Sequence, residues 1–189
     1  MPELELRRTA YHERVYPGDG QPFTQRITAQ HADALVARAV RLRCPVRVSV
    51  TGTVTIVREH VGRAARTITL EPLVRPSELT ERQDLDLRIV AAAPARLVAD
   101  RHGILRIRAG LAEIPPAASW RLLDRGWLAC LRREGDPCTV SVAGRIALEH
   151  RALKAEGARP TFGAGLRRWE ARLLAAATGH ELAPGHTVV

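Results

Sequence analysis

The feature of this chain that most constrains its fold is an alternation of apolar and polar residues over positions 46–70. In the first half the apolar members are Val46, Val48, Val50, Val54 and Ile56, and the polar members are Arg47, Ser49, Thr51, Thr53 and Thr55. After a turn expected near Gly62, the pattern resumes at Thr67, Ile68, Thr69 and Leu70. Because successive side chains of a strand point to opposite faces, the pattern predicts one long hairpin with a buried face and a polar face. Gly52 falls on the apolar face, where we expect a bulge or a close backbone contact.

A helix directly before this hairpin is expected to cover its apolar face. Thr28 is a suitable N-cap, and the helix should run to about Arg43, because Pro45 ends it. Helical spacing places five apolar residues on one stripe, namely Ala32, Leu35, Val36, Ala39 and Val40. We therefore expect a helix-plus-hairpin domain over residues 1–75.

The second part of the chain predicts a further sheet and a last helix. Residues 72–83 are a polar connection and a candidate boundary. Alternation predicts strands over residues 87–91, 96–100 and 104–108, the last two joined by the turn Arg101-His102-Gly103. A helix is expected from about Leu166 to Thr178, capped by Gly179. The predicted fold is thus α+β, with a second domain over residues 84–178 and a flexible tail over 179–189.

Residues 117–153 combine turn and capping signals in a definite order. Pro116 suits the first turn of a helix, because its missing N–H costs no hydrogen bond there. Gly126 is a suitable left-handed residue to end that helix. Two short strands are expected next, around the turn sequence Glu134-Gly135-Asp136-Pro137. Ser141 is then placed to cap another helix, so the predicted order is helix, hairpin, helix.

This order resembles the back half of winged-helix DNA-binding regulators of the MarR and PadR kind. There a recognition helix ends before a hydrophobic-x-Arg-Gly-hydrophobic-hydrophobic step, a two-stranded wing follows, and Thr-Pro-Ala-Gly-Arg starts the next helix. Leu123-Asp124-Arg125-Gly126-Trp127-Leu128 matches the step. Ser141-Val142-Ala143-Gly144-Arg145 matches the helix start, with Ser for Thr and Val for Pro. The resemblance covers about a fifth of the chain.

The sequence departs from this family upstream of the resemblance. Such proteins carry two further helices before the recognition helix. Here residues 102–107 predict a strand, and only residues 108–114 could form a short helix. An ordinary α+β sheet, to which the hairpin simply adds two strands, is the alternative fold.

The resemblance implies a non-enzymatic protein that binds double-stranded DNA, as a transcriptional regulator or in maintenance of a mobile element. Ser119, Arg121 and Arg125 would enter the major groove, and Arg132 and Arg133 on the wing would contact phosphates or the minor groove. Arg145, in the next helix, completes the implied DNA-binding set. For Arg132 and Arg133 the alternative is a charged hairpin tip that discourages edge pairing.

The last helix has a face formed by Leu166, Trp169 and Leu173. This face is expected either to join two copies of the chain as a homodimer or to pack on its own domain.

Charge independently favours a polyanionic partner. The chain has 29 Lys and Arg residues against 20 Asp and Glu, a formal net charge of +9 and a pI near 11.0. Lys154 is the only lysine, and this preference for arginine indicates a GC-rich bacterial coding bias. That bias does not explain the excess of basic over acidic residues. An assembly module that binds an acidic protein, and an RNA-binding factor, are the alternatives to a DNA-binding protein.

No pattern of catalytic, nucleotide-binding or metal-binding residues was found, so no enzyme activity, metal or cofactor is expected. Cys44, Cys130 and Cys138 have no ligand spacing and are expected as reduced thiols, the last two as small core residues. Trp120, Trp127 and Trp169 are expected as core anchors, with base stacking as the alternative. The sequence has no membrane-spanning run and no secretory segment. It therefore predicts a cytoplasmic protein, associated with the nucleoid if it binds DNA.

Overall fold

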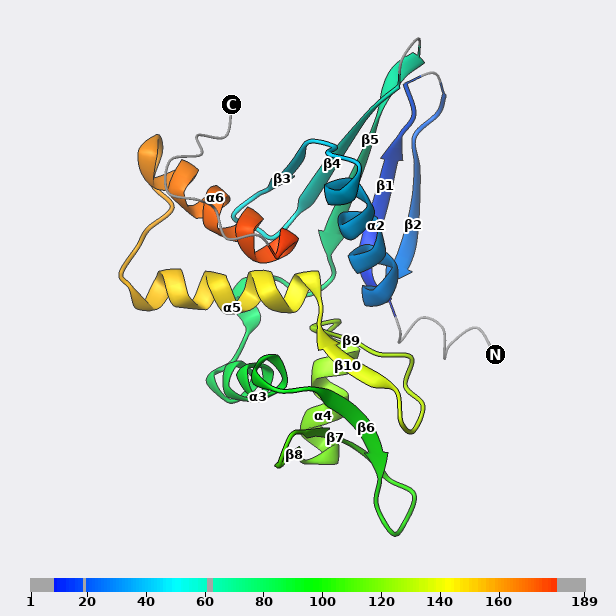
Figure 1. The fold of residues 1–189 in the computed structure, drawn as a ribbon. Coiled ribbons are helices and arrows are strands. Elements are labelled where there is room, and N and C mark those ends of the chain that lie inside the picture. The colour runs from blue at the N-terminus through cyan, green and yellow to red at the C-terminus, as the bar shows by residue number, and fades with distance from the viewer. Residues whose placement is uncertain (1–8, 19, 61–62, 180–189) are drawn as a thin grey trace.

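The computed structural model describes residues 9–18, 20–60 and 63–179, without the side chains of residues 59, 60, 63 and 64. The described residues form five α-helices and two five-stranded antiparallel sheets, which confirms the predicted α+β class. Figure 1 shows the first sheet in the upper half of the molecule, the second in the lower half, and a long helix between them. No helix in these ranges is long and apolar enough to cross a membrane. The turn expected near Gly62 and nearly all of the expected tail lie outside the described residues.

The first sheet has α2 (Ala29–Arg41) on its apolar face. Its strands are β1 (Thr9–Tyr16), β2 (Phe23–Thr28), β3 (Val46–Val48), β4 (Val54–His60) and β5 (Arg63–Pro72), in the order β2-β1-β5-β4-β3. Thr28 caps α2 by accepting a hydrogen bond from the His31 N–H at 3.2 Å. Ala32, Val36 and Ala39 of the predicted stripe are buried against the sheet. The predicted helix and its packing are therefore confirmed.

The predicted strand over residues 46–56 is wrong in one respect, because it is two strands. β3 pairs with β4 in antiparallel register, with Val46 opposite Ile56. In the turn between them Gly52 has a φ of 84°, and a Cβ there would lie 2.5 Å from Cγ of Pro76. Glycine alone fits both the turn and this neighbour. The alternation did not reveal the turn, because β3 and β4 both direct their apolar side chains to the same core and the apolar pattern therefore continues from one strand to the next.

The strand predicted over residues 87–91 is a helix, α3 (Glu81–Ala92), preceded by the short 3₁₀ helix η1 (Pro76–Glu78). Thr80 and Gln83 form a capping box in which each side chain accepts a hydrogen bond from the other residue's N–H. Leu87 and Val90 are buried on one helical face. The apolar alternation over residues 87–91 was therefore a weaker indicator of secondary structure than the capping box and the three-residue spacing of Leu87 and Val90.

The second sheet joins two hairpins. Its strands are β6 (Ala95–Ala99), β7 (Leu105–Ala109), β8 (Ala112–Ile114), β9 (Leu128–Ala129) and β10 (Pro137–Val140), in the order β8-β7-β6-β10-β9. The predicted β6–β7 hairpin is confirmed, and the Asp100 carboxylate accepts from His102 and Ile104 N–H groups in its turn. Residues 108–114 form the end of β7, a turn and β8 rather than a short helix. The helix α4 (Pro116–Asp124) begins at Pro116 as predicted.

The helix α5 (Val142–Ala155) contacts elements of both halves of the molecule, and α6 (Ala164–Thr178) follows it. α6 packs on α5, on β3 and on α2, and the buried core runs through residues of both predicted domains. Trp169 and Leu173 are only 2% and 0% exposed in this packing. Trp169 and Leu173 therefore pack on their own chain, which was the expected alternative, whereas Leu166 is only partly buried. A homodimer through this helix stays a prediction.

Candidate nucleic-acid interface

The two segments that carry the winged-helix resemblance meet where α4 ends and α5 begins. Gly126 ends α4 with a φ of 70°, as predicted, and a Cβ there would collide with Ala10 of β1. Ser141 caps α5 by accepting from the Gly144 N–H at 3.1 Å, and its hydroxyl donates to the Gly126 carbonyl at 2.6 Å. Gly144 lies against the Trp127 carbonyl, where a side chain would not fit. Close packing between the two segments therefore accounts for these motif residues.

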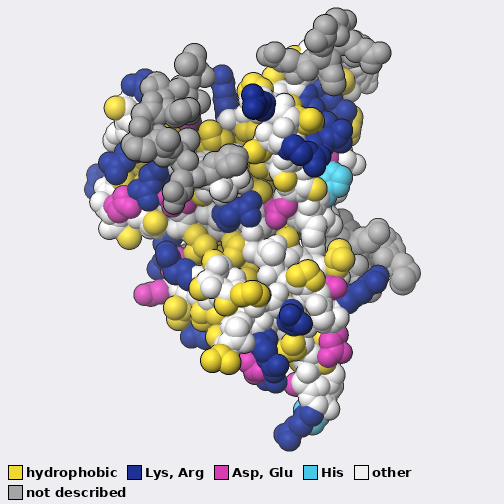
Figure 2. Space-filling model, in the orientation of Figure 1, with side chains coloured by type: hydrophobic (Ala, Val, Ile, Leu, Met, Phe, Trp, Pro, Cys, Tyr) yellow, Lys and Arg dark blue, Asp and Glu magenta, His cyan; other side chains and the backbone are white. Residues whose placement is uncertain are grey.

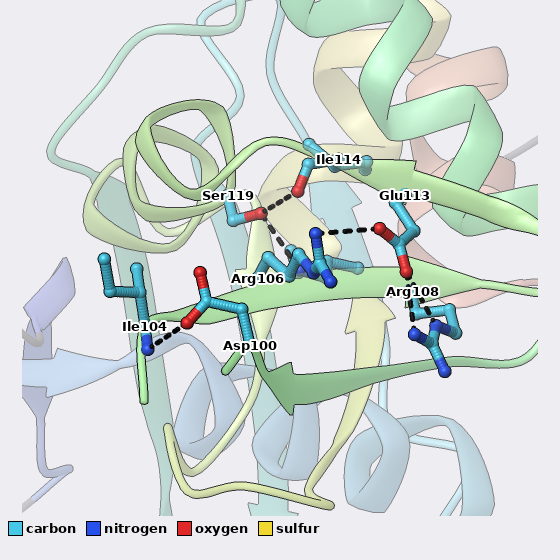
Figure 3. A network of polar contacts seen from close by, with 8 residues as sticks. Asp100, Ile104, Arg106, Arg108, Glu113, Ile114 and Ser119 are labelled. Atoms are coloured by element: carbon cyan, nitrogen blue, oxygen red, sulfur yellow. Dashed lines mark hydrogen bonds and ion pairs between the residues drawn. The ribbon is translucent and has the colours of Figure 1, made fainter. Parts of the chain in front are cut away.

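Ser119, expected in the DNA groove, is fully buried. Its hydroxyl accepts a hydrogen bond from the Ile107 N–H and donates one to the Ile114 carbonyl, both at 3.0 Å. These bonds fasten α4 to β7 and to the end of β8, as Figure 3 shows for the Ile114 side. A side chain without exposed surface cannot reach a base edge, so Ser119 leaves the candidate set.

Arg132, expected on the wing, is held inside the molecule. Its guanidinium donates to Asp124 Oδ1 at 2.7 Å and to the Leu123 carbonyl at 3.0 Å. It also lies 5.7 Å from the ring centroid of Trp120. With 15% of its side chain exposed, Arg132 connects the loop of the β9–β10 hairpin to the end of α4. It is therefore neither a free phosphate contact nor an exposed hairpin tip.

Arg145 also has a structural role. Its Nε and Nη2 donate to the carbonyls of Ala176 and Ala177 at 2.9 and 3.0 Å, and its Nη1 donates to the Val140 carbonyl at 2.7 Å. The last carbonyls of a helix lack partners within it and carry partial negative charge. Arg145 therefore closes the end of α6 and leaves the candidate set.

Three of the six predicted DNA-binding residues keep free positive charge at the surface. Arg121 on α4 and Arg133 in the hairpin loop are exposed. Arg125 is half-buried, with its guanidinium 5.4 Å from the ring centroid of Trp127. The bond between Arg132 and Asp124 keeps the loop beside the end of α4. We call Arg121, Arg125 and Arg133 the α4–hairpin arginines.

A second group, which the motifs did not indicate, lies at one end of the first sheet. Arg58 and Arg66 are directly opposite each other on β4 and β5. A hydrogen bond from the Val57 N–H to the Pro45 carbonyl at 3.0 Å brings the chain that leaves α2 beside β4. Figure 2 shows Lys and Arg side chains gathered over this end of α2 and the neighbouring strands. We call the group the sheet-end arginines: Arg38, Arg41, Arg43, Arg58 and Arg66.

The sheet-end arginines have no acidic partner in the described part of the chain. Nε and Nη2 of Arg58 and Nε of Arg66 are buried, and the described residues offer them no hydrogen-bond acceptor. Like charges directly opposite on neighbouring strands repel each other, and unsatisfied buried donors cost free energy. The sequence did contain a signal for this pair. Arg58 and Arg66 occupy strand positions whose side chains point to the same face as the buried apolar residues of β4 and β5, and an arginine at such a position is unusual.

Many other arginines are neutralised within the fold. Glu113 binds both Arg106 and Arg108, at 2.9 and 2.7 Å (Figure 3). Arg172 of α6 binds Glu149 and Glu156 of α5 and its C-cap. Asp84 of α3 binds Arg88 of the same helix and Arg151 of α5. Arg168 of α6 binds Glu156. These ion pairs neutralise much of the positive charge on β7, α3, α5 and α6.

A half-buried carboxylate connects the first sheet unit to α5. Asp33 of α2 accepts a hydrogen bond from the Val142 N–H at 2.7 Å. Burial raises the pKa of Asp33 to about 6, although the Val142 hydrogen bond and the charge of Arg145 act in the opposite direction. Burial and the neighbouring Asp33 also raise the pKa of Tyr11, which is fully buried on β1. This contact sets the position of α5, and with it the ends of α4 and the hairpin.

Comparisons of the chain with protein-family models, with curated proteins and with solved structures find no match. Within the described ranges, no group of three or more His, Cys, Asp or Glu side chains could hold a metal ion.

Proposed function

We propose that the protein binds nucleic acid without catalysing a reaction on it, with double-stranded DNA as its principal partner. The observation that carries the proposal is the gathering of the sheet-end arginines at one end of the sheet, with no acidic partner among the described residues. Arg38, Arg41 and Arg43 are exposed, and they lie beside the Arg58–Arg66 pair. Phosphate oxygens match the planar fork of donors that a guanidinium presents. A nucleic-acid backbone supplies such oxygens in series, so the exposed sheet-end arginines would contact successive phosphates.

The α4–hairpin arginines support the same partner class. In the resemblance to winged-helix regulators, α4 takes the place of the recognition helix, the β9–β10 hairpin that of the wing, and α5 that of the helix after it. The β7–β8 hairpin stands where those proteins have a second upstream helix, so the chain would be a variant of that plan. Arg121 and Arg125 would then face the groove and Arg133 the phosphates. Transcriptional control, or maintenance of a mobile element, is the role that such binding would serve.

The test is a titration of labelled duplex DNA, single-stranded DNA and RNA, followed by fluorescence anisotropy over salt concentrations from about 50 to about 200 mM. Three triple variants each remove three positive charges: R38Q/R41Q/R43Q at the sheet end, R121Q/R125Q/R133Q at α4 and the hairpin, and R101Q/R159Q/R167Q as the control. Arg101, Arg159 and Arg167 are exposed and lie on the β6–β7 turn, between α5 and α6, and on α6. Loss of three phosphate contacts should lower the slope of log affinity against log salt by roughly 2–3.

We expect the sheet-end and α4–hairpin variants to lower the slope, and the control to keep the slope of the native protein. Equal weakening by all three variants would mean that net charge, and not these surfaces, determines binding. Absence of binding to every nucleic acid at the lowest salt concentration would refute the proposal.

An acidic protein partner is the second candidate, favoured by the polar face of the first sheet. Thr55 and Thr69 are paired across β4 and β5 on the face opposite to α2, and neither is buried. If the partner is an acidic protein, we expect no binding to DNA in the same titration. A structured RNA is distinguished there directly, by tighter binding to RNA than to duplex DNA at equal salt.

A further inference from the structure

Two of the three cysteines face each other across the β9–β10 hairpin. The register pairs Thr139 with Ala129, which places Cys138 opposite Cys130 at the next step along the ladder. Both side chains are buried, with 3% and 5% of their surface exposed. Each thiol has the largest influence on the pKa of the other, as expected of close neighbours.

The position of this pair in the ladder suits a disulfide. The Ser141 N–H donates to the Trp127 carbonyl at 3.0 Å, which marks Ser141 and Trp127 as a hydrogen-bonded pair. Hydrogen-bonded and non-hydrogen-bonded pairs alternate along an antiparallel ladder, so Cys130 and Cys138 form a non-hydrogen-bonded pair. In such pairs the Cα atoms are about 4.5 Å apart, and disulfides need roughly 4.4–6.8 Å.

The surroundings of Cys130 favour its thiolate. The Arg132 N–H donates to Cys130 Sγ at 3.4 Å. The neighbouring Cys138 thiol lowers the pKa of Cys130 to about 7, and the N–H and positive charge of Arg132 act in the same direction, against the effect of burial and of Asp136. The same thiol contact, together with burial, raises the pKa of Cys138. The pair therefore has one nucleophilic sulfur and one sulfur that keeps its proton.

A small cavity is lined in part by Cys130. It has a volume of about 140 Å³ and lies between the start of α2 and the hairpin, where its lining includes Gln30, Leu123, Leu128, Cys130 and Arg132. Gln30 also donates a hydrogen bond to the Cys130 carbonyl, which ties the cavity wall to the hairpin. A water molecule occupies about 30 Å³ of liquid volume, so the cavity admits a molecule of the size of hydrogen peroxide.

We propose that Cys130 is a peroxide-reactive thiol and that Cys138 converts its oxidised form into an intramolecular disulfide. The Cys130 sulfur attacks one oxygen of hydrogen peroxide, the O–O bond breaks, and the leaving hydroxide takes up a proton to become water. Cys138 then attacks the sulfur of the resulting sulfenic acid, and its thiol proton leaves with the hydroxyl group as a second water. Two thiols lose two electrons in total, and one peroxide is reduced. This inference does not depend on nucleic-acid binding.

The test uses the full chain, hydrogen peroxide, and mass spectrometry after alkylation of the remaining thiols. Cys44 is an internal control, because it is half-buried and has no thiol beside it in the described structure. About half of Cys130 should be thiolate at neutral pH, against a few per cent for an ordinary cysteine, so it should react roughly tenfold faster than Cys44. The product should be a Cys130–Cys138 disulfide within one chain.

Two variants test the sulfenic acid intermediate. In Cys138→Ser, peroxide should leave a sulfenic acid on Cys130 that dimedone labels, and Cys130→Ser should give neither label nor disulfide. Oxidation of Cys44 as fast as Cys130 in the native chain would overturn the proposal. Disulfides between chains in place of the internal one, seen on a non-reducing gel, would also overturn it.

Discussion

Replacing Asp33 by asparagine should remove a pH-dependent part of the free energy of unfolding. Burial raises the pKa of this carboxyl from its ordinary 3.8 to about 6, so the folded chain binds the proton more tightly than the unfolded chain does. The stabilisation is therefore complete below the ordinary pKa and is lost as the pH rises through the pKa of the folded state. Asparagine keeps an oxygen that accepts from the Val142 N–H but does not titrate.

The magnitude follows from the two pKa values. A rise from 3.8 to about 6 corresponds to about 3 kcal/mol at most. Asp33 is partly exposed, and solvent screening reduces this figure to roughly 1–2 kcal/mol. Over this pH range the native chain should lose that much stability relative to Asp33→Asn.

The assay is urea unfolding of both chains at several pH values across the two pKa values, and the quantity of interest is the difference between the chains. Asp100→Asn is the matched control. Hydrogen bonds from the Ile104 and His102 N–H groups lower the pKa of Asp100 (Figure 3 shows the Ile104 bond). Asp100 therefore stabilises the fold above its ordinary pKa, and this contribution is lost as the pH falls. If the difference between native chain and Asp33→Asn did not change with pH, the reasoning about Asp33 would be refuted.

Three further substitutions test the structural roles of the motif residues. Ser119→Ala leaves the Ile107 N–H and the Ile114 carbonyl without a partner and should lower stability by about 1–3 kcal/mol in urea unfolding, whereas Ser77→Ala, at an exposed position, should have little effect. Gly144→Ala places a Cβ 2.8 Å from Val140 Cγ1 and closer still to the Trp127 carbonyl. The resulting overpacking should cost roughly 1–3 kcal/mol, although alanine favours helix, and a raised melting temperature would contradict this. Arg132→Ala should destabilise the fold by about 1–2 kcal/mol without changing the salt slope of nucleic-acid binding; a slope lowered by about one unit would instead restore its role as a phosphate contact.

Features that are complete within a few residues could be predicted from the sequence. The caps at Thr28 and Ser141 and the left-handed Gly126 each need only the hydrogen bonds and φ angles of their own turn. The β6–β7 hairpin was predicted for the same reason, since its turn is closed by Asp100. The errors over residues 46–56 and 87–91 arose where apolar alternation was compatible with more than one backbone path.

The sequence by itself determined the α+β class, the order of most elements and an excess of positive charge. Only the tertiary structure decided which charges are free. Arg145 finds carbonyl partners 31 and 32 residues away, and Ser119 is enclosed by strands that precede it in the chain. Arg58 and Arg66 become neighbours only through the register of β4 and β5. The physical reason is that a side chain's role at a surface depends on the groups within a few ångströms of it, and residues distant in sequence supply most of those groups.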